Sequence, residues 1–240
     1  MSNTKQKEPS FFDFLKSLGY TAPDVQRMDL RRNHIVTPFE REIAGARVLD
    51  LAAHDGRWSY AFAGAGAKEV VAIEGRQELV DEFGSFPDSP FKNAVKLSAG
   101  DIFEFCRAAV AKGEQFDVVA ILGIFYHIMS HYDLLLLASR MKPKLILIDS
   151  TFLDVPHCVM RIQKEPTDLA RNAIPYFAGQ RSAPIGIISL PALNVMAESI
   201  GYSVKQVPWS DVPAGQKGPV KDYFRPGNNR RFTFELRPKD

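Results

Sequence analysis

Two acidic residues end two successive apolar segments of the chain, and their placement indicates a site for a nucleoside-bearing cofactor. Asp50 closes an apolar segment that begins at Arg47 and leads into a tight turn ending at Gly56, and Glu74 closes the next apolar segment. The carboxyl ends of neighbouring parallel strands meet at one edge of a sheet, so both carboxylates would lie there. Glu74 is then placed to accept hydrogen bonds from both ribose hydroxyls, and Asp50 lies beside the turn where a charged tail would sit.

Basic side chains gather near the end of the chain, where they could grip an acidic substrate group such as a carboxylate or phosphate. They are Lys217, Lys221, Arg225, Arg230 and Arg231. Such a run is more often a solvated surface, and Arg231 is the member that we retain as a candidate site residue.

Alternating strand and helix patterns would position these residues. Predicted strands cover residues 47–51, 70–74, 94–97, 116–122 and 145–149, and predicted helices cover 58–64, 77–83, 102–112 and 133–140. The first, fourth and fifth strands are almost entirely apolar, which is typical of strands covered on both faces. The alternation predicts an α/β fold with a parallel sheet wound by right-handed crossovers.

The segments on either side of this core have weaker patterns. Residues 1–9 are predicted to be frayed, and residues 1–45 to form an N-terminal helical arm with a short amphipathic helix between Ser10 and Gly19. Residues 46–240 would form the main domain, in which a proline-containing insertion at 151–188 builds part of the substrate pocket.

The end of the chain predicts a helix and two strands. Ser189 would cap the helix and Gly201 would end it. Strands at 202–207 and 231–236, joined by a loop at 208–229 that is rich in proline and glycine, are expected to pair antiparallel at one sheet edge.

Composition limits the class of protein. The chain has 240 residues, 45% of them hydrophobic, and a net charge of only +2, which argues against binding nucleic acid through bulk electrostatics. Cys106 and Cys158 have no metal-ligand spacing, so neither a disulfide framework nor a metal site is predicted, and Cys106 fits a helical core position. The polar N-terminus and the lack of an apolar run of about 20 residues favour a cytoplasmic protein with no membrane segment.

The whole pattern resembles the class I S-adenosylmethionine-dependent methyltransferase superfamily over residues 46–236. The matching motifs are the run from Val48 to Gly56, Glu74-Gly75, Gly100-Asp101-Ile102, and the run from Phe116 through Leu122-Gly123. The resemblance implies a three-layer sandwich with a Rossmann-like, seven-stranded, mostly parallel sheet whose last strand is antiparallel. In the first motif, Ala52 and His54 replace two of the family's three glycines, and only Gly56 remains.

The resemblance also implies S-adenosyl-L-methionine as cofactor, with a role for each motif. Asp50 and the turn with Ala52, His54 and Gly56 would hold the amino-acid end, and Glu74 with Gly75 the ribose. Asp101 would accept the adenine amino group beside Ile102, and Leu122 and Gly123 would line the floor near the sulfonium. Purely structural roles are the alternative: Asp50 and Glu74 could cap helices, and Asp101 is a good helix N-cap. Trp58 and Trp209 would cover cofactor and substrate, or belong to the core.

A closer resemblance involves the run Leu122-Gly123-Ile124-Phe125-Tyr126-His127. This run, with two later segments beginning at Ser189 and Ser199, is similar to the tRNA wobble-uridine carboxymethyltransferase family and its small-molecule methyltransferase relatives. Arg231 falls where that family places a substrate-end arginine. The family's N-terminal Lys-Gly-Pro segment, which helps to recognise its carboxylated cofactor, has no counterpart here, so ordinary S-adenosylmethionine is favoured.

Methyl transfer from a sulfonium mainly requires alignment of the reacting atoms, and a proton-bearing oxygen or nitrogen acceptor also benefits from a base. His127 is the leading candidate because it follows the strand whose end would face the methyl group, and Tyr126 would orient substrate or contact the cofactor. Alternatively, both pack the start of the next helix. His131, one helical turn further on, and His157 are weaker candidates.

Three functions compete. The first is a methyltransferase acting on oxygen or nitrogen of a small molecule. The second is a tRNA-modifying transferase, disfavoured by the low charge. The third is a non-catalytic binding subunit whose altered glycine turn no longer holds a cofactor. A homodimer is left open.

Overall fold

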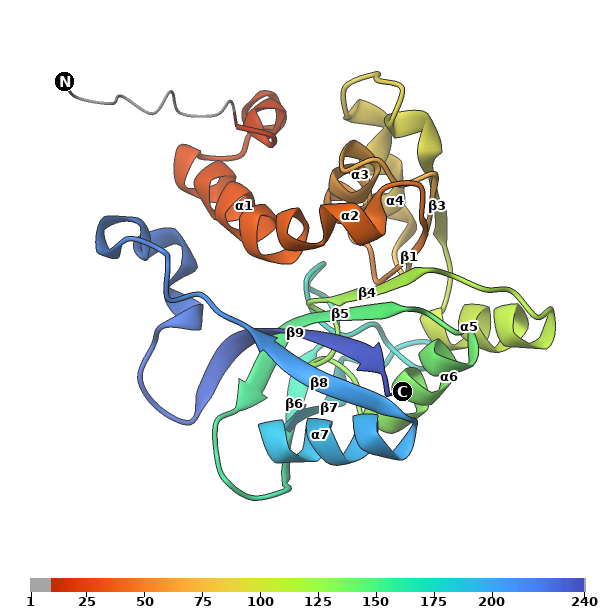
Figure 1. Ribbon diagram of the computed structural model, residues 1–240, viewed down its shortest axis with the longest axis vertical. Coiled ribbons are helices and arrows are strands. Elements are labelled where there is room, and N and C mark those ends of the chain that lie inside the picture. Colours follow the sequence, from red (N-terminus) through yellow and green to blue (C-terminus); the bar gives the residue numbers. More distant parts are fainter. Residues whose placement is uncertain (1–9, 240) are drawn as a thin grey trace.

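The computed structural model describes residues 10–239 and contains one large central sheet (Figure 1). Its strand order is β3-β2-β1-β4-β5-β9-β8. The strands are β1 (Arg47–Leu51), β2 (Glu69–Glu74), β3 (Val95–Ala99), β4 (Val118–Leu122), β5 (Leu145–Leu153), β8 (Tyr202–Val207) and β9 (Asn229–Pro238). Strands β1 to β5 pair in parallel, and β9 is antiparallel to both β5 and β8. The predicted seven-stranded sheet with an antiparallel last strand is therefore confirmed.

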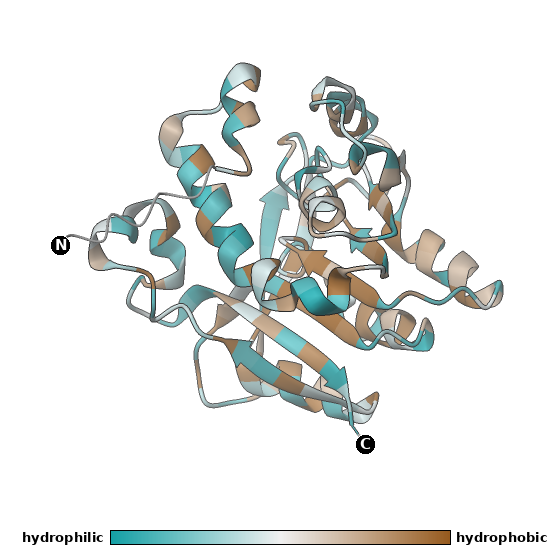
Figure 2. Ribbon diagram, turned by 45° about the horizontal axis from the view of Figure 1, so that its top comes forward, coloured by the Kyte–Doolittle hydropathy of each residue, from teal (hydrophilic) through white to brown (hydrophobic). Residues whose placement is uncertain are grey.

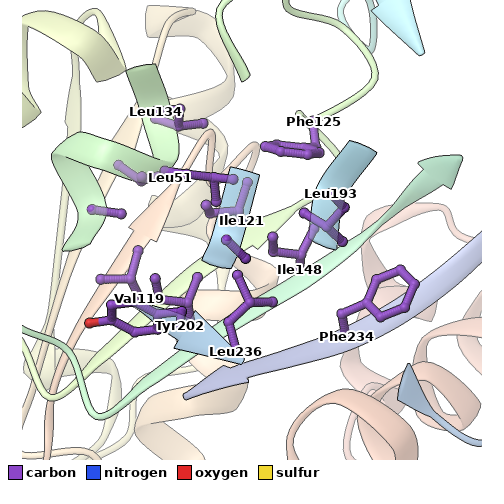
Figure 3. Packing of buried hydrophobic residues seen from close by; sticks show 14 of the residues in the cluster. Leu51, Val119, Ile121, Phe125, Leu134, Ile148, Leu193, Tyr202, Phe234 and Leu236 are labelled. Atoms are coloured by element: carbon purple, nitrogen blue, oxygen red, sulfur yellow. The ribbon is translucent and has the colours of Figure 1, made fainter. Parts of the chain in front are cut away.

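Helices cover both faces of this sheet. The helices are α1 (Ala22–Ile35), α2 (Glu40–Ile43), α3 (Arg57–Gly64), α4 (Gln77–Glu82), α5 (Ile102–Ala111), α6 (His131–Arg140) and α7 (Leu190–Ser199). One apolar cluster joins α5, α6 and α7 to one face, where Leu51, Ile121 and Ile148 meet Leu134 and Leu193 (Figure 3). A second cluster joins α1, α2 and α3 to the other face. The result is the three-layer arrangement expected for strands buried on both sides.

The hydropathy of the elements follows this layering (Figure 2). The central strands are mainly hydrophobic, and every residue of β4 is buried. The long N-terminal helix α1 carries both colours, because it buries one face and exposes the other. Within residues 10–239, no helix combines the length and apolar character that crossing a bilayer requires.

The segment before the sheet packs closely on the core. A 3-10 helix at Asp13–Leu18 ends at Gly19, and Phe12 and Leu15 are fully buried in the cluster that contains α3. Helix α1 then begins with a reciprocal cap in which the Thr21 hydroxyl and the Asp24 carboxylate each accept a backbone N–H. Helix α1 thereby brings Arg31 to the carboxyl edge of the sheet. The residues predicted to be frayed, 1–9, lie outside the described part of the chain.

The insertion after β5 contains regular structure that weak periodicity concealed. Strand β5 continues to Leu153, four residues past its predicted end at Asp149. Strands β6 (Met160–Pro166) and β7 (Ser182–Ile188) then form an antiparallel hairpin. Most residues of β6 are exposed, so its sequence lacks the apolar repeat that marks a half-buried strand. Between these strands, residues 167–181 return toward the carboxyl edge of the large sheet.

Candidate active site

A cavity of about 400 Å³ opens at the carboxyl edge of the sheet, beneath helix α1 and the loop between β6 and β7. Its volume lies within the range of roughly 300–1,000 Å³ that is typical of small-molecule sites. Of the fourteen residues proposed above, twelve line it: Ala52, His54, Trp58, Glu74, Gly75, Asp101, Ile102, Leu122, Gly123, Tyr126, His127 and Arg231. Asp50 and Gly56 do not.

The turn after β1 has a glycine-like backbone even where glycine is absent. The φ angles of Ala52, His54 and Gly56 are 60°, 55° and 79°, all in the left-handed region that glycine favours. Ala52 and His54 accept a strain of roughly 1–2 kcal/mol each in this region. At both positions where a non-glycine residue occupies this turn, the backbone therefore keeps a conformation that glycine favours.

Gly56 has a packing role in this turn. It precedes α3, and a Cβ atom placed on it would lie 2.6 Å from Cδ2 of Phe83. A side chain at this position would collide with Phe83, so Gly56 allows the turn to pack closely on the core without lining the cavity.

Asp50 differs from its predicted role at the cofactor's amino-acid end. It is 1% exposed, and its Oδ2 accepts a hydrogen bond of 2.6 Å from the Ser59 hydroxyl on α3. Burial raises the pKa of Asp50 to about 7, against the opposing effect of that hydrogen bond. Asp50 therefore joins β1 to α3 beneath the turn, because its strand position directs the side chain into the layer of helices.

Glu74 and Asp101 face the cavity from the ends of β2 and β3. The Glu74 carboxylate accepts the backbone N–H of His54 at 2.9 Å and that of Arg76 at 3.1 Å, which fixes the carboxylate beside the turn. Asp101 is the N-cap of α5, since its Oδ1 accepts the N–H groups of Phe103 and Glu104. Each carboxylate oxygen can accept more than one hydrogen bond, so capping leaves both acids able to bind a ligand.

The loop between β6 and β7 closes this side of the cavity. Nη2 of Arg76 donates to the carbonyl oxygens of Thr167 and Leu169 and holds the loop in place. Ile174 packs against Gly75, where an added Cβ would lie 3.1 Å from the isoleucine Cδ1. Gly75 thus allows an apolar cover over the cavity next to Glu74.

Gly123 forms the floor at the middle of the sheet. It follows β4 with a φ of 95°, and its N–H donates to the backbone carbonyl of Asp149 at 2.8 Å. A Cβ on Gly123 would lie 3.7 Å from Nη2 of Arg231. In the strand order, Gly123 at the end of β4 therefore lies between Glu74, at the end of β2, and Arg231 on β9.

His127 lies in the cavity wall with a carboxylate behind it. Its Nδ1 lies 2.6 Å from Oε2 of Glu165 on β6, and that oxygen also accepts the N–H of Ala173. A carboxylate accepts only, so Nδ1 carries the proton and Nε2 keeps a free lone pair. Burial lowers the pKa of His127, and Glu165 offsets that effect only in part. His127 therefore presents an oriented, neutral imidazole to the cavity, and its ring lies 3.9 Å from that of Tyr126.

Glu165 was missed by the sequence reasoning. It lies 38 residues after His127, inside the insertion, on a strand without a recognisable repeat. No spacing rule connects the two residues, because only the fold of the hairpin brings them together.

Asp149 is a second missed residue, and it organises the basic side of the cavity. It is fully buried at the inner part of β5 and accepts four side-chain hydrogen bonds: from Arg31, Arg231, Tyr223 and Thr233. Burial opposes its ionisation, but the Arg231 and Arg31 guanidinium groups outweigh that effect and hold the pKa of Asp149 below its usual range. The apolar sequence around Asp149 indicated only a buried strand.

Other candidates lie outside the cavity. His131 is buried with Nε2 3.1 Å from the carbonyl oxygen of Gly186, so it fastens α6 to the hairpin. Trp209 packs between His34 and Tyr223 and donates to the Thr233 hydroxyl, and it is therefore a core residue. The basic residues Lys217, Lys221, Arg225 and Arg230 do not line the cavity, which leaves Arg231 alone of its run.

Comparison with known proteins identifies the fold. No protein-family model and no curated protein sequence matches the chain. Among solved structures, the N-terminal domain of EvdMO1, crystallised in the presence of S-adenosylhomocysteine (SAH) and D-fucose, is similar with a TM-score of 0.64. It has 16% sequence identity, over 92% of this chain and 84% of that one.

Two further solved structures are similar to this chain in fold. A putative S-adenosylmethionine-dependent methyltransferase from Listeria monocytogenes has a TM-score of 0.60 and 14% identity, over 92% of this chain and 100% of that one. The glycopeptide N-methyltransferase MtfA has a TM-score of 0.54 and 16% identity, over 88% and 89% of the two chains. The chain has the class I S-adenosylmethionine-dependent methyltransferase fold.

Proposed function

We propose that the chain is an S-adenosylmethionine-dependent methyltransferase that moves a methyl group to an oxygen or nitrogen atom of a small-molecule acceptor. The observation that carries this proposal is the distribution of groups along one cavity. Glu74 and Asp101 lie at the ends of β2 and β3, the left-handed turn follows β1, and His127 follows β4. Acids suited to adenosine therefore occupy one half of the cavity, and an oriented base occupies the other.

The residues present fit the cofactor. Glu74 would accept the ribose hydroxyls, Asp101 the adenine amino group, and the turn at 52–56 would leave room for the amino-acid tail because its backbone has a glycine-like path. Bound there, the cofactor would supply a methyl group on a sulfonium, which is a good leaving group.

The chain itself would supply alignment and proton removal. Gly123 and Leu122 would form the floor that holds the reacting atoms in line, and the loop carrying Ile174 would exclude water. His127 would take the acceptor's proton at Nε2, and Glu165 would stabilise the resulting imidazolium. Two similar structures support this choice of substrate class by what their names say of their acceptors. One is the glycopeptide N-methyltransferase MtfA, and the other is a Burkholderia thailandensis 1,6-didemethyltoxoflavin N1-methyltransferase with its acceptor and SAH bound, which has a TM-score of 0.53 and 15% identity over 96% of this chain and 84% of that one.

Replacing Glu74 with alanine tests the cofactor site. We expect SAH to bind at least about tenfold more weakly, since the change removes the ribose acceptor and loosens the turn at His54; tenfold corresponds to about 1.4 kcal/mol. Isothermal titration calorimetry measures this, with Glu78→Ala, an exposed carboxylate on α4, as the matched control. Absence of SAH binding to the unmodified protein would refute the methyltransferase proposal and favour a non-catalytic subunit.

Restoring the missing glycines tests whether the altered turn is competent. We expect the double substitution Ala52→Gly and His54→Gly to leave SAH affinity within about threefold, because both residues already have positive φ. Relief of roughly 1–2 kcal/mol of strain at each position exceeds the roughly 0.4–1 kcal/mol that the greater freedom of glycine in the unfolded chain costs, so the free energy of unfolding should rise by about 1–2 kcal/mol. Calorimetry and urea denaturation measure both quantities. A gain of a hundredfold in affinity would instead mean that the natural turn is defective.

A further inference from the structure

The half of the cavity opposite Glu74 and Asp101 contains two arginines that share one acid. Arg31 comes from α1 and Arg231 from β9, and both line the cavity while being only 8% and 7% exposed. On the basis of the methyltransferase function proposed above, we propose that Arg31 and Arg231 bind an anionic group, a carboxylate or a phosphate, of the methyl acceptor.

The charges of this cluster do not cancel. Arg31 and Arg231 both donate to Oδ1 of Asp149, and within residues 10–239 neither guanidinium lies within 4.0 Å of another carboxylate. Burial raises the pKa of Tyr223, so this phenol stays neutral and adds no negative charge. Two positive charges therefore face one negative charge in a site largely shielded from water, and an anionic ligand would complete the balance.

Neighbouring arginines make a useful contrast. Arg27, one turn earlier on α1, forms a two-point pair with Asp222 at 2.7 Å for both contacts. Arg57 is paired in the same way with Asp55 beside the turn. Each of these cations has its own acid, whereas Arg31 and Arg231 have one between them.

The two guanidinium groups are also held in fixed positions. Arg31 donates from Nε to the Tyr223 hydroxyl and from Nη2 to Asp149, and Arg231 donates from Nε and Nη2 to Asp149. In the described part of the chain, Nη1 of neither arginine has a hydrogen-bond partner. Each planar guanidinium group is therefore fixed by hydrogen bonds from Nε and Nη2 and keeps N–H donors at Nη1. This arrangement suits the geometry of carboxylate and phosphate oxygens.

The position of the pair favours the acceptor over the cofactor. Strand order places β5 and β9 beyond β4, on the side away from β2 and β3, so Arg231 lies across Gly123 from Glu74 and Asp101. His127 lies on the same side of Gly123, and burial together with Arg231 lowers its pKa. Glu165, which lies beside His127, already accepts hydrogen bonds from His127 and from the N–H of Ala173. An acceptor held by its anionic group would therefore meet the base.

Anion binding to the SAH-saturated protein tests the proposal without a known acceptor. The probe is trifluoroacetate, followed by fluorine NMR at constant ionic strength in chloride, with inorganic phosphate as competitor. We expect saturable binding of trifluoroacetate that phosphate displaces, and at least tenfold weaker binding in Arg31→Gln. Arg27→Gln, which removes a fully paired arginine of the same helix, should bind the probe as the unmodified protein does. The relative affinities of the two anions tell whether a carboxylate or a phosphate is preferred.

The outcomes separate this inference from the function on which it rests. Failure of SAH itself to bind would refute the methyltransferase proposal. Normal SAH binding without saturable anion binding, or with equal binding in Arg31→Gln, would overturn the anionic acceptor alone. Weaker SAH binding in Arg31→Gln would also overturn it, by assigning the arginines to the cofactor's own carboxylate. Should Arg31→Gln fail to fold, Arg31→Lys, which keeps the charge and loses the fork, provides the same comparison.

Discussion

Replacing His127 with glutamine should slow methyl transfer by about 10²- to 10⁴-fold while SAH affinity stays within about twofold. The size of the effect is that of a positioned general base, equivalent to about 2.7–5.4 kcal/mol in the activation barrier. SAH affinity should hold because the contact of His127 is with Glu165, and Glu74 and Asp101 are unaffected. The measurement is SAH release with an acceptor found by screening, beside calorimetric SAH binding. His157→Ala, an exposed histidine outside the cavity, is the control.

The pH profile of the same reaction tests the role of Glu165. Burial lowers the pKa of His127, so the base is already neutral at pH 7, and the rate should fall only as pH drops below about 6.5. Glu165 raises that pKa by its hydrogen bond and charge; Glu165→Gln should therefore move the acid limb to still lower pH and reduce the plateau rate. Proton NMR of the His127 ring reports the same pKa without an acceptor. An unmoved acid limb in Glu165→Gln, or full activity in His127→Gln, would remove the pair from the mechanism.

Replacing Asp149 with alanine should reduce the free energy of unfolding by about 3–5 kcal/mol at pH 7. The carboxylate is fully buried and accepts four hydrogen bonds, so its loss leaves Arg31 and Arg231 as buried like charges. A protein with an ordinary free energy of unfolding, roughly 5–15 kcal/mol, would lose a large fraction of it. Urea denaturation measures the effect. Asp154→Ala is the matched control, since it breaks the partly exposed pair with Arg230 and should cost no more than about 1 kcal/mol.

The pH dependence of stability gives a second readout for Asp149. Its folded-state pKa is lower than that of an unfolded aspartate, so its contribution is fully present above about pH 4 to 5 and decreases as pH falls through the lower folded value. The acid-induced loss of stability should therefore be smaller in Asp149→Ala than in the unmodified protein. The double variant Asp149→Ala, Arg231→Met should be less destabilised than the sum of the single changes. Strict additivity would mean that the ion pair contributes no coupling energy.

Elements with a strong local pattern were predictable from the sequence. The apolar strands around Leu49, Ile121 and Ile148 are buried on both faces, and such burial leaves a continuous apolar run. Ser189 caps α7 through its hydroxyl, as the capping pattern predicts. The boundaries differ from the prediction where burial is weak: β3 runs from Val95 to Ala99 instead of 94–97, and all five of its residues are half-buried or exposed.

Segments without a burial pattern were not predictable. The hairpin of β6 and β7 has an exposed strand, and the loop at 208–229 contains 3-10 turns at Ala214–Gln216 and Gly218–Tyr223. The second of these brings Tyr223 to Asp149, and nothing in its local sequence shows that contact. Short turns of this kind depend on tertiary packing more than on local propensity.

The sequence by itself determined the alternating α/β layout, the acids at 74 and 101 and the histidine after β4, because strand periodicity and strand ends are local properties of the chain. The tertiary structure alone decided that Asp50 faces away from the cavity, that Glu165 supports His127, and that Arg31 meets Asp149 from 118 residues away. Such pairings depend on which strands become neighbours and which face a side chain takes. They arise only when the complete sheet has formed and the carboxyl ends of its strands lie side by side.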